Sequence, residues 1–127
     1  MSNRETIHKY FEALNHENWQ ELGELFHSEA SYKATGARER KGRDEITSFF
    51  STLFSPWLTH NDGPTRLILD GDAAAAEVTF TGTTQDGRTV SFDAVDVFTF
   101  HDGKLMTAST WYDLPAVRRL LESTAGG

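Results

Sequence analysis

Two aspartates stand inside a segment that otherwise has the composition of a buried β-strand. The segment reads FDAVDVFTF, residues 92–100, and it contains Asp93 and Asp96. Because successive side chains of a strand point to opposite faces, Asp96 shares a face with Phe98 and Phe100, whereas Asp93 lies on the other face. A carboxylate among large apolar side chains is costly to ionise, so its pKa rises and the neutral acid can donate a hydrogen bond. Asp96 is therefore the first candidate for chemistry, and the open alternative is a carboxylate paired with an arginine or a backbone amide.

Three further side chains could take part in chemistry, and each also has a purely structural interpretation. Tyr10 falls on an apolar helical stripe, so it is either a core residue or a hydroxyl donor. Asp113 precedes Leu-Pro and either caps the last helix or contributes a carboxylate to a site. His60 follows SPWLT and is a candidate for the mouth of a pocket. The five histidines have neither H-x-H nor H-E-x-x-H spacing and the chain has no cysteine, so the sequence predicts no metal site.

Helices are predicted in the first half of the chain. Apolar residues recur at helical spacing in three segments, residues 7–14, 19–26 and 46–54. Ser2 or Asn3 is expected to cap the first helix and Asp44 the third, which ends before Pro56. Between the second and third helices we expect a short strand around Ala30–Ala34, followed by a charged loop, ARERKG.

Strands are predicted from Thr65 onward. Four segments have strand composition, namely TRLILD, AAAAEVTFTGTT, RTVSFDAVDVFTF and KLMTASTWYD, and the turn sequences DGD, QDG and HDG separate them. A short final helix is expected over LPAVRRLL. Helices followed by a strand meander predict an α+β fold, with helices on one face of a curved antiparallel sheet that encloses a pocket. We expect a single domain over residues 1–122 and a disordered tail over residues 123–127.

Composition restricts the possible partners and compartments. The 127 residues carry a formal net charge of −7, which repels nucleic acid phosphates. No apolar run approaches the roughly 20 residues of a membrane helix, and the first residues do not have the pattern of a secretory signal. The absence of cysteine fits a cytoplasmic protein.

The order of elements, together with GRDEITSFF, FDAVDVFTFHDGKL and WYDLPAVRRLL, resembles the NTF2-like superfamily in its SnoaL-like and ketosteroid isomerase-like branch. The resemblance covers the chain from about Tyr10 to Leu121, and it implies a cone-shaped fold, often dimeric, with a mostly apolar pocket. Ketosteroid isomerases carry D-x-x-D-V-x-x-F on the long strand and a tyrosine in the first helix. By this resemblance Asp96 and Tyr10 form an oxyanion hole. The proton-shuttling aspartate of those enzymes falls at Ala34 here.

Two sister families suggest roles for the last strand. Limonene epoxide hydrolase-like enzymes end in W-R-D, which Asp113 matches, but Glu77 and Thr79 stand where their Arg and Asp would be. SnoaL-like polyketide cyclases use an aspartate as general acid and base. By that resemblance Asp113 or Asp96 could hold such a role.

Together these observations predict a small cofactor-independent enzyme of the isomerase, cyclase or ring-opening type. It would act by acid/base chemistry and oxyanion stabilisation on a hydrophobic carbonyl compound such as a polyketide, terpenoid or steroid-like molecule. The alternative is a non-catalytic domain that binds a small apolar ligand, and Ala34 favours it. We expect a homodimer with no nucleic acid or membrane partner. The expected catalytic residues are Asp96, Tyr10 and Asp113, and the expected substrate-binding residues are Trp111, Tyr112, Phe98, Phe50, Phe54, Trp57, Tyr32 and His60.

Overall fold

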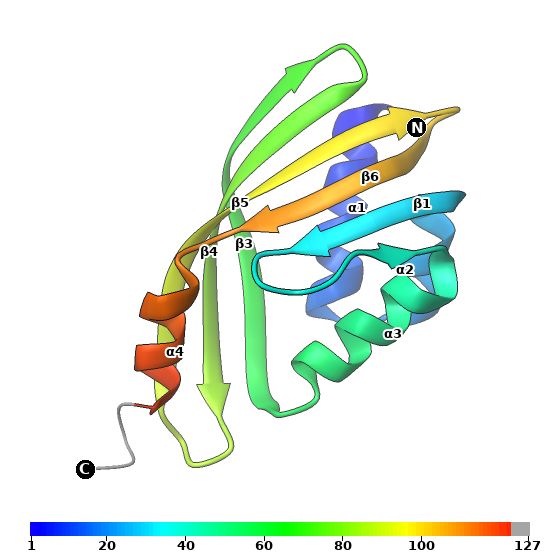
Figure 1. Cartoon of the computed structure of the whole chain (residues 1–127). Helices are drawn as coiled ribbons and strands as arrows, with labels where there is room; N and C mark the ends of the chain where they lie inside the picture. The colour runs from blue at the N-terminus through cyan, green and yellow to red at the C-terminus, as the bar shows by residue number, and fades with distance from the viewer. Residues whose placement is uncertain (123–127) are drawn as a thin grey trace.

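The protein is an α+β fold in which a strongly curved six-stranded sheet packs against helices (Figure 1). The structure is a computed structural model and describes residues 1–122. In chain order the elements are α1 (Asn3–Asn15), α2 (Trp19–Leu25), β1 (Phe26–Ala34), β2 (Arg40–Lys41), α3 (Arg43–Phe54), β3 (Trp57–Asp70), β4 (Ala73–Thr84), β5 (Thr89–His101), β6 (Lys104–Trp111) and α4 (Leu114–Glu122). The expected tail, residues 123–127, lies outside the described residues.

Two of the helix starts can be compared with the capping residues that the sequence predicts. Ser2 caps α1 through a capping box with Glu5, as expected. The third helix begins earlier than expected, with Gly42 and not Asp44 at its N-cap position. Glu45 explains the difference, because its side chain accepts the Lys41 backbone N–H at 3.1 Å and so ties the preceding chain to the first turn.

The sheet has the order β2-β1-β6-β5-β4-β3. Its strands from β3 to β6 form the antiparallel meander that the turn sequences predict. The expectation of a purely antiparallel sheet is wrong at one place, because β1 pairs with β6 in parallel. Two strands also begin earlier than expected: β1 starts at Phe26 and β3 at Trp57, so the segment 57–64 is part of the sheet.

An aromatic core packs between α1, α3 and the concave face of the sheet. At its centre the Tyr10 ring contacts four phenylalanine rings at centroid distances of 5.2 to 6.2 Å, those of Phe11, Phe26, Phe50 and Phe98. Each fully buried ring of this kind stabilises the fold by about 1.5–3 kcal/mol relative to an exposed one. The core therefore fixes α1 against β5, the two elements that carry Tyr10 and Asp96.

One glycine is required by close packing at an end of the sheet. The Trp57 ring lies over Gly82, where an added Cβ would stand 2.7 Å from Trp57 Cε3. The same ring contacts Phe80 at 4.9 Å. Gly82 therefore lets an aromatic row close over this end of the concave face.

Among residues 1–122, no helix has the length and apolar character needed to cross a membrane.

Candidate functional site

Asp96 lies on the concave face of β5, where the strand alternation predicts it. The residue is 5% exposed, between the buried Phe98 and the half-buried Ala94 on the same face, and Asp93 on the opposite face is exposed. Its Oδ1 atom is buried and has no hydrogen-bond partner among the described residues. Burial is the main cause that raises the pKa of Asp96 to about 7. A hydrogen bond from Thr110 lowers this pKa, and the charge of Asp62 raises it further. Asp96 is therefore a carboxylic acid that is partly or fully neutral near neutral pH.

Two hydroxyl groups orient the Asp96 carboxyl. Thr110 stands directly opposite Asp96 in the β5–β6 register, and its hydroxyl hydrogen-bonds the carboxyl group. The Tyr32 hydroxyl lies 2.6 Å from Thr110 Oγ1. A threonine hydroxyl has a single proton, so when Thr110 donates to Asp96 it must accept from Tyr32. The chain Tyr32–Thr110–Asp96 thus fixes one side of the carboxyl and leaves Oδ1 directed into the core.

Tyr10 brings a second hydroxyl from α1 to the same interior. The residue is 1% exposed, and no described residue forms a hydrogen bond with its hydroxyl. Burial raises the pKa of Tyr10 above its ordinary value, and the charges of Asp96, Tyr32 and Asp62 raise it further. The phenol is therefore neutral at all physiological pH values and available as a donor.

A third polar group, on β3, completes the interior cluster. Asp62 stands opposite the buried Phe80 in the β3–β4 register. Burial raises the pKa of Asp62 to about 6, and His60 acts in the opposite direction. His60 lies on the same face of β3, stacked on Phe54 at 4.2 Å, with Nδ1 buried and unpaired among the described residues. The interior cluster thus consists of Asp96, Tyr10, Asp62 and His60, each with a polar atom that lacks a partner within residues 1–122.

Ala34 takes a position next to this cluster. It is buried on β1 and pairs with Thr110 in the parallel β1–β6 register, while the preceding Lys33 is exposed. A methyl group therefore lies beside the Thr110–Asp96 pair at the position where the resemblance to ketosteroid isomerases would put a carboxylate. The Ala34 side chain cannot accept a proton at that point of β1.

Three candidates on the last strand and its end lie outside the cluster. Trp111 is 52% exposed on the opposite sheet face, and its Nε1 donates to Ser109 Oγ at 2.9 Å. Tyr112 is half-buried and contacts the Phe92 ring at 5.6 Å. Asp113 is exposed and caps α4, because its Oδ1 accepts the Ala116 backbone N–H at 3.0 Å. Of the two interpretations of Asp113, the structure supports the helix cap, and of the two aromatics only Tyr112 faces the concave side.

The other expected substrate-binding residues lie along the concave side of the sheet. They divide into buried rings at the centre and half-buried rings toward one end: Tyr32, Phe50, Phe54 and Phe98 in the first group, Trp57 and His60 in the second. From Trp57 an aromatic row continues through Phe80 and Phe92 to Tyr112, with centroid distances of 4.9 to 5.6 Å along the row. The half-buried Phe92 and Tyr112 leave this part of the row in contact with solvent.

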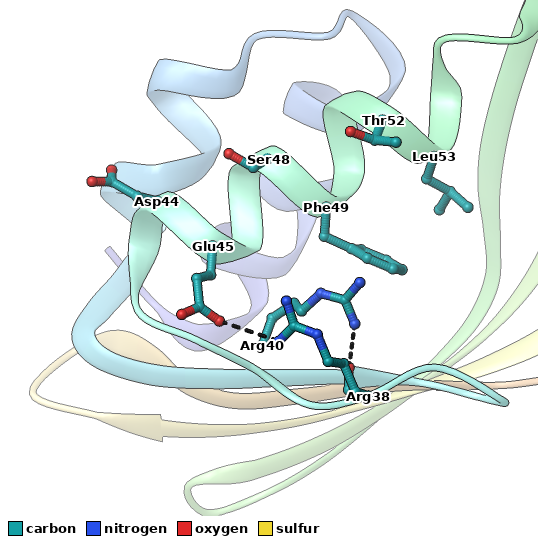
Figure 2. Close-up of a pocket in the computed structure, with 8 residues that line it drawn as sticks. All are labelled: Arg38, Arg40, Asp44, Glu45, Ser48, Phe49, Thr52 and Leu53. Carbon is teal, nitrogen blue, oxygen red and sulfur yellow. Dashed lines mark hydrogen bonds and ion pairs between the residues drawn. The ribbon is translucent and has the colours of Figure 1, made fainter.

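A cavity of about 510 Å³ lies outside the cluster, between α3 and the chain before it (Figure 2). Arg40 places its guanidinium 4.7 Å from the Phe49 ring centroid, and Arg38 forms an ion pair with Glu45 at 3.7 Å. On its inner side the Phe49 ring contacts Tyr32 at 5.5 Å. Phe49 is therefore the wall between this open cavity and the Tyr32–Thr110–Asp96 chain.

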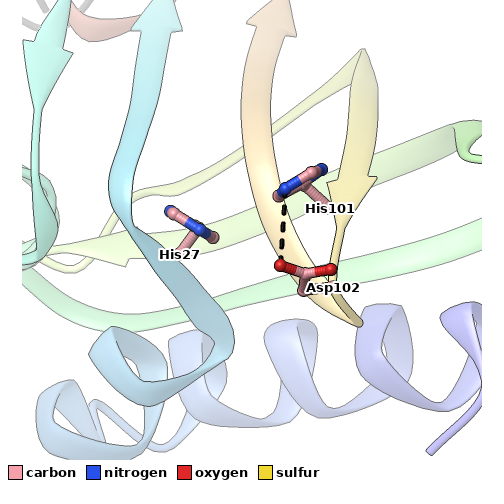
Figure 3. A group of neighbouring side chains, drawn as sticks. All are labelled: His27, His101 and Asp102. Atoms are coloured by element: carbon pink, nitrogen blue, oxygen red, sulfur yellow. Dashed lines mark ion pairs between the residues drawn. The ribbon is translucent and has the colours of Figure 1, made fainter.

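One surface group among the described residues has the composition of a metal site, namely His27, His101 and Asp102 (Figure 3). His101 Nε2 lies 3.4 Å from Asp102 Oδ2, and both residues are exposed. The His27 Nδ1 atom accepts the Glu29 backbone N–H at 3.1 Å. Neutral His27 then carries its proton on Nε2, so neither nitrogen has a free lone pair. The group fits a hydrogen-bonded surface cluster better than a preformed metal site.

The convex face of the sheet exposes apolar side chains. Val95 and Val97 of β5 are 38% and 39% exposed, and Ile68 of β3 is 51% exposed. This is the face that also carries Asp93, whose Oδ1 accepts the Thr79 hydroxyl at 2.9 Å. Homodimer formation stays a prediction for this chain.

The residues predicted from the sequence do not include Asp62 and Thr110. A strand that begins at Trp57 puts His60 and Asp62 on one face by period-two alternation. Thr110 follows from the β5–β6 register, in which the HDG turn places it opposite Asp96.

Comparisons with known proteins agree with the fold described above. No curated protein matches the chain. Solved structures with the same fold include a protein assigned as a SnoaL-like polyketide cyclase from Jannaschia sp. CCS1 (TM-score 0.87, 19% identity, covering 95% of this chain and 92% of that one). The fold is also similar to that of an NTF2-like protein of unknown function from Burkholderia pseudomallei K96243 (TM-score 0.86, 20% identity, covering 94% of this chain and 98% of that one). A third similar structure is an LEH-like epoxide hydrolase of M. tuberculosis (TM-score 0.79, 17% identity, covering 95% of this chain and 90% of that one). These identities are evidence for the NTF2-like fold alone. A model of the SnoaL-like domain matches residues 7–107, and the chain therefore belongs to the SnoaL-like domain family.

Proposed function

We propose that this protein is a cofactor-independent enzyme that acts on a hydrophobic carbonyl compound, with Asp96 and Tyr10 as hydrogen-bond donors to the oxyanion of an enolate or alkoxide. The reaction would be an isomerisation, a cyclisation or a ring opening. Polyketide-, terpenoid- and steroid-like molecules are the substrate classes that an aromatic interior suits. Structurally similar proteins with enzymatic descriptions, a SnoaL-like polyketide cyclase and an LEH-like epoxide hydrolase, support the class of activity.

The observation that carries this proposal is the buried, unpaired Oδ1 atom of Asp96. A buried polar atom without a partner is destabilising by about 1–3 kcal/mol, so its presence needs an explanation. Because burial raises the pKa of Asp96 to about 7, the carboxyl can hold a proton below that pH. A neutral acid in an apolar surround is a donor that strengthens as negative charge develops on its partner. The oxyanion-hole aspartic acid of ketosteroid isomerases is kept neutral by an apolar site in the same way.

The interior offers an anionic transition state hydrogen-bond donors and, among the described residues, no buried cation. Within residues 1–122, no Lys or Arg side chain is among the buried residues, so an oxyanion would depend on the hydroxyl and carboxyl donors of the cluster. One well-placed donor is worth about 3–4 kcal/mol in such a site. Asp96 and Tyr10, which come from β5 and α1, would act together only because the aromatic core holds these two elements in place.

A second function is favoured by Ala34. With no proton acceptor at that position of β1, the same interior could bind a small apolar ligand and perform no reaction. The two functions differ in the contribution of the Tyr10 hydroxyl and the Asp96 carboxyl to ligand affinity. An oxyanion would accept hydrogen bonds from both groups, whereas an apolar ligand would accept none.

A Tyr10→Phe variant tests the two against each other. If Tyr10 donates to an oxyanion, the variant should bind the phenolate form of 4-nitrophenol about tenfold more weakly, since a hydrogen bond to a charged group is worth about 1.5–3 kcal/mol. Ligand absorbance reports the ionised phenol, and tryptophan fluorescence gives an independent titration.

Tyr112→Phe is the matched control, because Tyr112 is half-buried at the end of β6 and not in the cluster. It should leave the affinity unchanged. Equal binding by wild type, Tyr10→Phe and an Asp96 variant would contradict the oxyanion site and favour the non-catalytic pocket.

A further inference from the structure

Asp62 occupies a position that the resemblance to ketosteroid isomerases does not use. It lies on β3, and the last residue of α1 holds its backbone from both sides: Asn15 Oδ1 accepts the Asp62 N–H at 2.8 Å, and Asn15 Nδ2 donates to the Asp62 carbonyl at 3.0 Å. These two bonds join α1 to β3 at the level of the cluster. These bonds fix the backbone of Asp62 and do not involve its carboxylate.

The Asp62 carboxylate has no hydrogen-bond donor among the described residues. The charge of Asp62 raises the pKa of three neighbouring side chains, Asp96, Tyr10 and Tyr32. The register gives its place directly: Asp62 pairs with Phe80 and Phe80 pairs with Phe92, which lies on the same face of β5 as Asp96. Asp62 therefore lies on the concave face of the sheet with Asp96 but on another strand, and its half-buried state leaves it in contact with solvent.

His60 favours the ionised form of Asp62. Its Nε2 lies 3.0 Å from Glu17 Oε2, in the turn after α1, and the imidazole has a side-chain exposure of only 4%. Glu17 adopts a left-handed backbone with φ 54°, which is uncommon for a residue other than glycine. The surface carboxylate thus holds the imidazole in place on the face of β3 that also carries Asp62.

We propose that Asp62 is the proton acceptor of this site, in place of the carboxylate that Ala34 lacks. The proposal rests on the oxyanion site formed by Asp96 and Tyr10. It assigns the base to β3 and the acid to β5, so that the two carboxyl groups approach a bound ligand from different strands.

The proton transfer balances within these groups. The C–H bond next to the carbonyl breaks, its proton forms an O–H bond on Asp62, and the electron pair moves to the carbonyl oxygen. That oxyanion accepts hydrogen bonds from the Asp96 carboxyl and the Tyr10 hydroxyl. Asp62 then returns a proton to carbon. One negative charge moves from Asp62 to the ligand and back, so Asp62 and the ligand are not both negative during the transfer.

Hydrogen exchange on a simple ketone tests the assignment. In D₂O, wild-type protein should accelerate deuterium incorporation next to the carbonyl of 2-tetralone, followed by proton NMR. Because Asp62 is only half-buried, we expect the proton that it takes up to exchange for solvent deuterium before it is returned. Asp62→Asn should lower the protein-dependent exchange at least ~100-fold, because an amide cannot take up the proton. It should leave the 4-nitrophenolate affinity equal to or above that of wild type.

Asp93→Asn is the matched control, since it removes a carboxylate from the convex face of β5, and it should change neither quantity. Exchange by Asp62→Asn at the wild-type rate would overturn the assignment, and so would a wild type that does not accelerate exchange. Loss of phenolate binding in Asp62→Asn would also overturn it, because it would make Asp62 a structural residue. Failure of the oxyanion site itself has a different signature: phenolate binding would be insensitive to Tyr10 and Asp96, whatever happens at Asp62.

Discussion

Asp96→Asn is expected to be more stable than wild type at pH 8, by up to about 4 kcal/mol. Burial raises the pKa of Asp96 to about 7, well above that of an aspartate in an unfolded chain. Between about pH 4 and pH 7, Asp96 is therefore protonated in the folded state and ionised in the unfolded state. Wild-type stability falls with rising pH across this window, and the variant lacks this loss because asparagine does not ionise.

Urea denaturation of both proteins between pH 4 and pH 9 measures the effect. The difference in unfolding free energy should be smallest at pH 4, grow up to pH 7 and level off above it. Asp93→Asn serves as the control on the convex face, where a surface substitution changes stability by no more than about 0.5 kcal/mol. A difference that does not vary with pH would mean that Asp96 is ionised in the folded protein throughout.

Asp96→Leu is expected to weaken binding of 4-nitrophenolate about 100-fold at pH 6, the second large effect. Leucine fills a similar volume but removes the donor, and a factor of about 100 lies in the upper part of the 1.5–3 kcal/mol range of a hydrogen bond to a charged group. Asp96→Asn should bind with intermediate affinity, because its amide N–H₂ still donates. Wild-type affinity should also decline as the pH rises through about 7, where Asp96 loses its proton.

Isothermal titration of the three proteins over pH 5.5 to 8.5 gives both results. The expected order of affinity is wild type, Asp96→Asn and Asp96→Leu, with a pH dependence only in wild type once ionisation of the ligand has been subtracted. Tighter binding by Asp96→Leu would indicate that the interior selects apolar ligands and does not use Asp96 as a donor.

Strand alternation was sufficient to place Asp96, because one residue of offset would turn the whole apolar set of β5 away from the core. Tyr10 followed from helical periodicity in the same way. These local patterns extend over many residues, and the burial of one face fixes them. The resemblance to the NTF2-like superfamily needed more, namely the order of such elements together with the segments GRDEITSFF, FDAVDVFTFHDGKL and WYDLPAVRRLL.

Features that depend on contacts distant in sequence did not follow. The parallel pairing of β1 with β6 joins segments about 75 residues apart, and no local pattern specifies it. Asp62 was missed because Gly63 and Pro64 resemble a loop, whereas the structure accommodates them with a register shift between Pro64 and Arg66. For Asp113 the sequence allows two interpretations, a helix cap or a site carboxylate. The hydrogen bond from the Ala116 backbone N–H supports the cap.

The two carboxyl groups of the interior have different environments, and this difference assigns their roles. His60 lowers the pKa of Asp62, whereas the charge of Asp62 raises that of Asp96. With a pKa of about 6 for Asp62 and about 7 for Asp96, Asp96 keeps its proton to higher pH than Asp62 does. An acid and a base separated in this way are what a reaction through an enolate needs.

The proposed function depends above all on Asp96 being a neutral acid inside the folded protein, and carbon-13 NMR of the aspartate carboxyl groups tests this most directly. With Asp96→Asn used to assign the resonance, we predict an Asp96 carboxyl that titrates with a pKa of about 7. A carboxyl that titrates near ~4, as in an unfolded chain, would contradict the assignment of Asp96 as a donor.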